Sequence, residues 1–127
     1  MSGEFRFQKL TVWQKSIGLA QFVYELTEKF PSSERFGLIN QTRRAAVSVS
    51  SNIAEGAGRS SDSDFARFLQ IAYGSLMEVV SQLHLSTVLK FCRSEDIASG
   101  LATAEEIAKL LSGLRVSLVG SKNHSKN

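Results

Sequence analysis

The sequence predicts an all-α protein folded as an antiparallel, up-down-up-down four-helix bundle. Apolar residues recur at steps of three and four along four long segments, which is typical of helices that bury one face. The 127 residues include only one proline, which argues against a loop-rich β fold. The linkers between the four segments are short, and short linkers force neighbouring helices to run antiparallel.

The first helix is expected over residues 11–30. Thr11 is the expected N-cap, and Gln14, three residues later, would complete a capping box. Pro31 disfavours the α conformation of the residue before it and so ends the helix. One face is expected to contain Trp13, Ile17, Ala20, Tyr24 and Thr27, widened by Leu19, Val23, Leu26 and Phe30.

The second helix is expected over residues 33–58, capped by Ser32 or Ser33 and with Glu34 in its first turn. Gly56 and Gly58 are expected to stop it, because glycine accepts the left-handed conformation without steric cost. Small residues on its apolar face would let neighbouring backbones approach closely, which predicts a central position. That face comprises Leu38, Thr42, Ala45, Ala46, Val49, Ile53 and Ala57.

The third helix is expected over residues 62–91, opened by Ser61 or Asp62, and a close helix contact is the expected reason for Gly74 in its interior. Its apolar face would contain Phe65, Leu69, Ala72, Leu76, Val79, Val80 and Leu83, extended by Leu85, Val88 and Leu89.

The fourth helix is expected over residues 94–120, with Ser94 as its cap and Gly120 at its end. Its apolar face would contain Ile97, Leu101, Ala104, Ile107, Leu110, Leu111, Leu114 and Leu118. Residues 1–120 would therefore form a single domain, followed by a flexible polar tail over residues 121–127.

The net charge of +3 is mildly basic, so one copy would attract nucleic acid only weakly, but the charges of assembled copies would add. Cys92 is the single cysteine and cannot form an internal disulfide. The N-terminus does not look like a signal peptide. No stretch approaches the roughly 18–20 apolar residues that cross a bilayer. A cytoplasmic location is expected, without membrane contact.

A polar line follows the second helix and another follows the third. Arg44, Asn52 and Glu55 lie on the first, and Glu78 lies on the second. One interpretation makes Glu55 and Glu78 a catalytic or metal pair, but di-iron bundles use Glu-x-x-His motifs that this sequence lacks. The favoured interpretation pairs Arg44 with Glu55 or Glu78, inside the bundle or at a seam between subunits, to fix register and choice of partner.

Five basic residues are candidates for an outer nucleic-acid-binding surface, although scattered arginines are also typical of an ordinary solvated face. Phosphate contact by them would be salt-sensitive. It would also tolerate sequence changes, because no exposed aromatic residues interleave with them to stack on bases. The candidates are Arg43, Arg59, Arg67, Lys90 and Arg93.

No catalytic residue, metal ligand set or cofactor site is expected, and neither is a small-molecule substrate. His84 and His124 have no cluster of ligand residues around them. Cys92 has no histidine partner evident in sequence that would activate it as a nucleophile. The chain is therefore not expected to be an enzyme.

Nine short motifs stand out along the chain. They are LTVW at 10–13, FP at 30–31, ERFGL at 34–38, QTRRAA at 41–46, SNIAEG at 51–56, GR at 58–59, FL at 68–69, IA at 71–72 and GSL-x-E at 74–78. Together they resemble the bacterial four-helix-bundle proteins found in intervening sequences of 23S ribosomal RNA genes. The resemblance covers residues 5–91 and is highly specific over 34–78, whereas the fourth helix shares only a generic leucine pattern.

This resemblance implies a cyclic homopentamer without an assigned reaction. Related bundles are accessory subunits of diversity-generating retroelements, where they partner a reverse transcriptase and its RNA. Ser16 stands where alanine is usual, and Ser50 where proline is usual, which puts a kink in the second helix in doubt. The expected function is a non-catalytic, pentameric scaffold associated with RNA or DNA. The alternative is a pure protein–protein assembly module.

Overall fold

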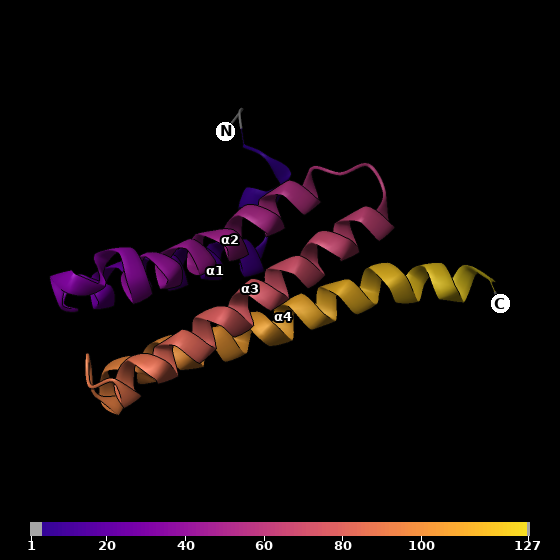
Figure 1. The fold of residues 1–127 in the computed structure, drawn as a ribbon. Coiled ribbons are helices and arrows are strands. Elements are labelled where there is room, and N and C mark those ends of the chain that lie inside the picture. The colour runs from indigo at the N-terminus through magenta and orange to yellow at the C-terminus, as the bar shows by residue number, and fades with distance from the viewer. Residues whose placement is uncertain (1–3, 127) are drawn as a thin grey trace.

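The computed structural model describes residues 4–126 of the chain and the side chains of residues 4–120. Its four long helices are α1 (Thr11–Thr27), α2 (Asn40–Ala57), α3 (Asp62–Val88) and α4 (Ser94–Lys126). Helix α1 packs against α2 and α4, and α3 packs against the same two neighbours. In Figure 1 the α1–α2 pair forms one layer and the α3–α4 pair forms the other. The predicted all-α, up-down four-helix bundle is therefore confirmed.

The core lies along the bundle axis and receives side chains from all four helices. Every residue of the apolar face predicted for the second helix is buried. The predicted faces of the third and fourth helices are mostly buried, but Leu85, Val88, Leu89 and Leu110 are exposed. The side chains without solvent contact include Val23, Ala46, Val49, Ile53, Ala72, Leu76, Val79 and Ile107.

Five buried hydroxyl groups each donate a hydrogen bond to a carbonyl of their own helix, three or four residues earlier. The pairs are Ser16 to Trp13, Thr27 to Val23, Thr42 to Leu38, Ser50 to Val47 and Ser86 to Leu83. These side chains are thus satisfied without reaching across the core.

The buried face of α1 differs from the predicted one. Ile17 and Tyr24 are exposed, whereas Val12 and Ser16 join Leu19 in the core. The predicted capping box is also wrong. Helix α1 starts directly after Leu10 without a side-chain cap, and the Gln14 amide instead donates to the Gln8 carbonyl at 2.8 Å in the preceding 3₁₀ turn, Arg6–Lys9.

The connection from α1 to α2 is more irregular than predicted. Helix α1 ends at Thr27, and a 3₁₀ turn (Ser32–Glu34) and a wide π turn (Arg35–Ile39) precede α2. The helical path breaks at Gly37, whose φ is −104° and ψ is −114°. The side-chain cap comes from Glu34, which accepts from the Leu38 N–H at 3.2 Å, rather than from Ser32 or Ser33.

Three glycines have roles that differ from the predicted ones. Gly58 ends α2 with a φ of −86°, so this helix end does not use the left-handed conformation. Gly56 is buried against α3, where an added β-carbon would lie 2.6 Å from Cβ of Phe68. Gly74, for which a close helix contact was predicted, would have nothing within 4 Å of its β-carbon. Close packing of α2 and α3 therefore depends on Gly56.

The start of α3 is confirmed, because the Ser61 hydroxyl accepts from the Asp64 N–H at 3.1 Å. The helix ends at Val88 rather than near residue 91. Lys90 follows it in the left-handed region, at a φ of 64°.

Ser94 is not the cap of α4, because the Asp96 carboxylate accepts from the Arg93 N–H at 2.8 Å and Ser94 already belongs to the helix. Helix α4 continues through Gly120, so the predicted end there is wrong. Flexibility of residues 121–127 stays a prediction, and Asn127 lies outside the described residues. Over the described residues, no helix combines the length and the apolar character needed to cross a membrane.

Candidate assembly and nucleic-acid surfaces

A hydrogen-bonded polar seam joins α2 and α3 halfway along the bundle. The hydroxyls of Ser48 and Ser75 lie 2.9 Å apart. The amide of Asn52 donates to the Ser48 carbonyl at 2.8 Å and to its hydroxyl at 3.0 Å. Asn52, one turn after Ser48, therefore fixes the position of the Ser48 hydroxyl that contacts Ser75. Gln82, further along the same line of α3, buries its Oε1 without a hydrogen-bond partner among the described residues.

The charged members of the two polar lines do not pair as predicted inside the bundle. Arg44 and Glu78 are both exposed and line a hollow of about 460 Å³ beside the seam. Among the ion pairs within residues 4–120, none joins Arg44 to a carboxylate, and Glu55 pairs with Arg59 at 2.8 Å. Arg44, Glu55 and Glu78 lie outside the buried face of their helices, where water screens their charges. Pairing of Arg44 at a seam between subunits stays a prediction.

Glu55 and Glu78 are also not brought together as a catalytic or metal pair. Because Ser48 faces Ser75 across antiparallel helices, the level of Glu55 lies ten residues, or about 15 Å, from that of Glu78. Among the described side chains, no cluster of three or more histidine, cysteine or acidic residues is placed to hold a metal ion.

The five candidate basic residues do not form one surface. Arg59 and Arg67 lie where α2 ends and α3 begins, with their guanidinium carbons 4.7 and 4.6 Å from the centre of the Phe68 ring. Each also meets a carboxylate of its own helix region, Glu55 for Arg59 and Asp64 for Arg67. Much of their charge is thus directed toward the protein itself.

Arg43, Lys90 and Arg93 lie toward the opposite end of the bundle. Lys90 and Arg93 belong to the α3–α4 connection, where Arg93 pairs with Glu95 and Asp96, each at 3.5 Å. The backbone hydrogen bond from Arg93 is the main reason that the pKa of Asp96 lies below its ordinary value.

Arg43 holds α1 to α2 rather than facing solvent. Its Nε donates to the Thr27 hydroxyl at 2.9 Å, and its Nη2 donates to the Tyr24 carbonyl at 3.2 Å and the Glu28 carboxylate at 3.0 Å. The guanidinium also lies over the Tyr24 ring at 4.5 Å, and only 24% of the side chain is exposed. The sequence could not show this role, because all three partners lie on α1 or directly after it.

Arg43→Ala is therefore expected to lower the free energy of unfolding by about 1–2 kcal/mol, because it removes charge-assisted hydrogen bonds to α1. Arg43→Lys should recover only part of the loss, since an ammonium cannot reproduce the planar fork. Urea unfolding followed by circular dichroism measures the change, with Lys9→Ala as control, because Lys9 is exposed and forms no ion pair within residues 4–120. If Arg43→Ala left stability unchanged but weakened binding to heparin, Arg43 would instead be a surface residue that contacts polyanions.

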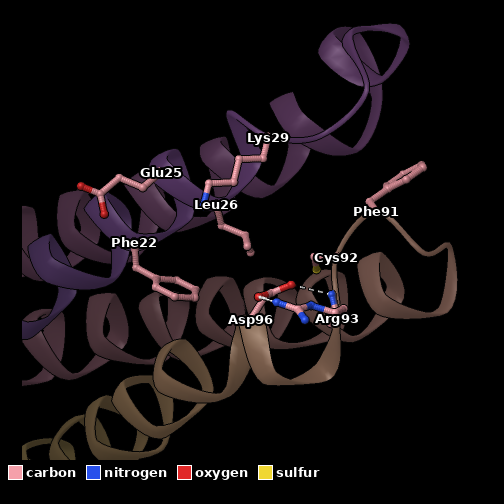
Figure 2. A pocket seen from close by; sticks show the side chains of 8 residues that line it. All are labelled: Phe22, Glu25, Leu26, Lys29, Phe91, Cys92, Arg93 and Asp96. Atoms are coloured by element: carbon pink, nitrogen blue, oxygen red, sulfur yellow. Dashed lines mark hydrogen bonds and ion pairs between the residues drawn. The ribbon is translucent and has the colours of Figure 1, made fainter.

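A second hollow, which the sequence did not suggest, lies between α1 and the α3–α4 connection (Figure 2). It measures about 380 Å³ and contains two cationic and two acidic side chains beside aromatic rings. Among its described lining residues there is no histidine to activate the Cys92 thiol, which lies 3.2 Å from the Ser86 hydroxyl. The lining residues are Phe22, Glu25, Leu26, Lys29, Phe91, Cys92, Arg93 and Asp96.

The fold and these surfaces define an all-α four-helix-bundle protein with a polar seam between α2 and α3. The chain belongs to the 23S rRNA-intervening sequence protein family, whose sequence profile matches residues 8–113. The predicted resemblance is therefore confirmed, and the match continues past residue 91 into α4.

The fold is also similar to a crystal structure from Bacteroides thetaiotaomicron, described as a protein with unknown function from the S23 ribosomal protein family. The two chains share 26% sequence identity and superpose with a TM-score of 0.74. The similarity covers 83% of this chain and 98% of the other. No curated protein matches the chain.

Proposed function

We propose that this chain is a non-catalytic bundle that self-assembles through its outer helix faces and acts as a scaffold. The copy number we propose is five, as the family resemblance implies. The observation that supports self-assembly is the composition of the outer face of α3, which an isolated bundle would be expected to keep polar.

Apolar side chains are exposed along α3 from Ile71 to its end at Val88. A helix at the surface of a monomeric protein usually confines its apolar residues to the face that meets the core. Exposed apolar patches commonly mark interaction sites, because covering them removes apolar surface from water. The exposed apolar residues of this helix are Ile71, Tyr73, Met77, Leu85 and Val88.

Light scattering coupled to gel filtration tests self-assembly directly. Chains of 13.9 kDa should elute as a species of about 70 kDa if five copies assemble. A species of one chain mass at micromolar concentration would contradict the proposal. Repeating the measurement with added RNA shows whether the assembly also takes up nucleic acid.

Contact with RNA or DNA is a second candidate, and the distribution of charge indicates where it would occur. Lys122 and Lys126 supply two of the three net positive charges, so the rest of the chain is close to neutral. In an assembly, the tails of several copies would add their charges and bind a polyanion through counterion release. A reverse transcriptase that works on RNA is a candidate protein partner of such a scaffold.

Removal of residues 121–127 is therefore expected to weaken binding to heparin, and elution should occur at lower salt. The matched control is Lys9→Ala with Lys109→Ala, which removes the same amount of charge from two exposed positions of the bundle. Equal weakening in truncation and control would mean that only net charge matters. Retention unaffected by the truncation would contradict a role for the tail.

A further inference from the structure

Phe36 is the most exposed large apolar side chain among the described residues, with 89% of its surface open to solvent. It lies in the π turn between α1 and α2, next to Gly37. An aromatic ring of this kind removes a large apolar area from water when a partner covers it, and aromatic anchors carry much of the energy of protein interfaces.

Contacts on both sides of Phe36 hold the backbone of this turn. Leu38 and Ile39, which follow Gly37, are buried in the core. On the other side, the Glu34 carboxylate accepts from the Leu38 N–H at 3.2 Å, and the Glu34 N–H donates to the Pro31 carbonyl at 2.9 Å. An anchor that is already ordered loses little conformational entropy on binding. Phe36 thus has the properties of a preformed knob.

A groove between α3 and α4 offers an apolar surface for such a ring. It has a volume of about 350 Å³, and the partly exposed Met77 lies at its edge. Methionine adapts its shape and makes favourable contacts between its sulfur and aromatic rings. The groove residues used here are Met77, Val80, Leu101 and Ala108, with Glu105 beside them.

The charges beside the knob and the groove are complementary. Arg35 directly precedes Phe36, is exposed, and forms no ion pair within residues 4–120. Glu105 lines the groove, and within residues 4–120 its one ion pair is with Lys109, at 3.7 Å in a highly exposed pair. The knob belongs to the α1–α2 layer and the groove to the α3–α4 layer (Figure 1). A contact in which the ring of one copy fills the groove of another would therefore join two different surfaces.

We infer that Phe36 of one copy docks into the α3–α4 groove of the next, and that Arg35 pairs there with Glu105. This inference rests on the proposed self-assembly and names the contact through which it occurs. The surfaces that meet are different, so the contact is head-to-tail, and a head-to-tail contact generates a ring when its rotation closes.

The test compares molecular masses by light scattering. Phe36→Ala and Met77→Glu should each lower the mass of the assembly to that of one chain, with an unchanged helical circular dichroism signal. Phe5→Ala is the matched control, because Phe5 is also highly exposed but lies outside the knob and the groove. Mixing the two variants should produce a heterodimer, because the first retains the groove and the second retains the knob.

Charge reversal provides an independent arm. Arg35→Glu and Glu105→Arg should each weaken assembly, and the double variant should restore it. A Phe36→Ala protein that keeps the full mass would overturn this inference and leave self-assembly intact. A wild-type protein with the mass of one chain would instead overturn the proposed function. Mixed variants that stay apart would show that the α3–α4 groove is not the docking site.

Discussion

Leu76→Ala is expected to lower the free energy of unfolding by about 2–5 kcal/mol, the largest effect that we expect from a single substitution. Leu76 is completely buried at the middle of α3. Several other residues of the same buried core are alanines, including Ala46 and Ala72. Such small side chains cannot extend to fill the space left by the leucine, so a cavity would remain. Urea unfolding at one fixed protein concentration measures the loss.

Leu85→Ala is the control on the same helix. Leu85 is exposed, so its truncation should change the free energy of unfolding by less than about 0.5 kcal/mol. If the outer face of α3 takes part in assembly, the same substitution should lower the mass of the assembly. Equal losses of stability from both substitutions would contradict the division of α3 into a core face and an outer face.

Gly56→Ala is expected to destabilise the protein by about 1–3 kcal/mol through overpacking. The added methyl group would lie 2.6 Å from Cβ of Phe68 and 3.0 Å from Cδ1 of Phe65. A β-carbon sits next to the backbone and cannot swing away, so the end of α2 would have to separate from α3. This steric cost exceeds the intrinsic gain in helix propensity from replacing glycine by alanine.

Gly18→Ala provides the opposite result in the same assay. Gly18 lies inside α1 and would have nothing within 4 Å of an added β-carbon. Alanine should therefore raise the melting temperature there, by an amount equivalent to about 0.5–1 kcal/mol. Similar effects at positions 18 and 56 would show that α2 and α3 do not approach as closely as Gly56 suggests.

The fold could be predicted from the sequence where one periodic pattern dominates a helix. Helix α2 is such a case, because the residues predicted for its apolar face follow one stripe and all of them are buried, whereas Val47 lies off that stripe and is exposed. Helix α1 carries apolar residues on several sides, so its spacing also allowed a face containing Ile17 and Tyr24, which are exposed. Only packing against α2 and α4 decides between such faces.

Helix ends were harder to predict, because several nearby polar residues could serve as caps. Glu34 caps in place of Ser32 and Ser33, and Asp96 completes the start of α4 in place of Ser94. Helix α2 is continuous through Ser50, from residue 40 to 57.

The candidate surfaces could be predicted only in part, because their chemistry depends on neighbours distant in sequence. Spacing along α2 indicated the polar line with Asn52, which does order a contact with α3. The partners of Arg43 lie sixteen or more residues away for Thr27 and Tyr24, beyond the reach of any local pattern. Phe36 was visible only as part of a family motif, and no periodicity marks it as exposed.

The five buried hydroxyls that bond within their own helices have a consequence for how the bundle forms. Each is satisfied as soon as its helix exists, and none has to wait for a group on another helix. Helices can therefore come together without leaving a hydroxyl stranded away from water during docking. The fit of apolar shapes, such as Gly56 against Phe68, then guides docking together with the few polar contacts between helices, those of Arg43 with α1 and of Ser48 with Ser75.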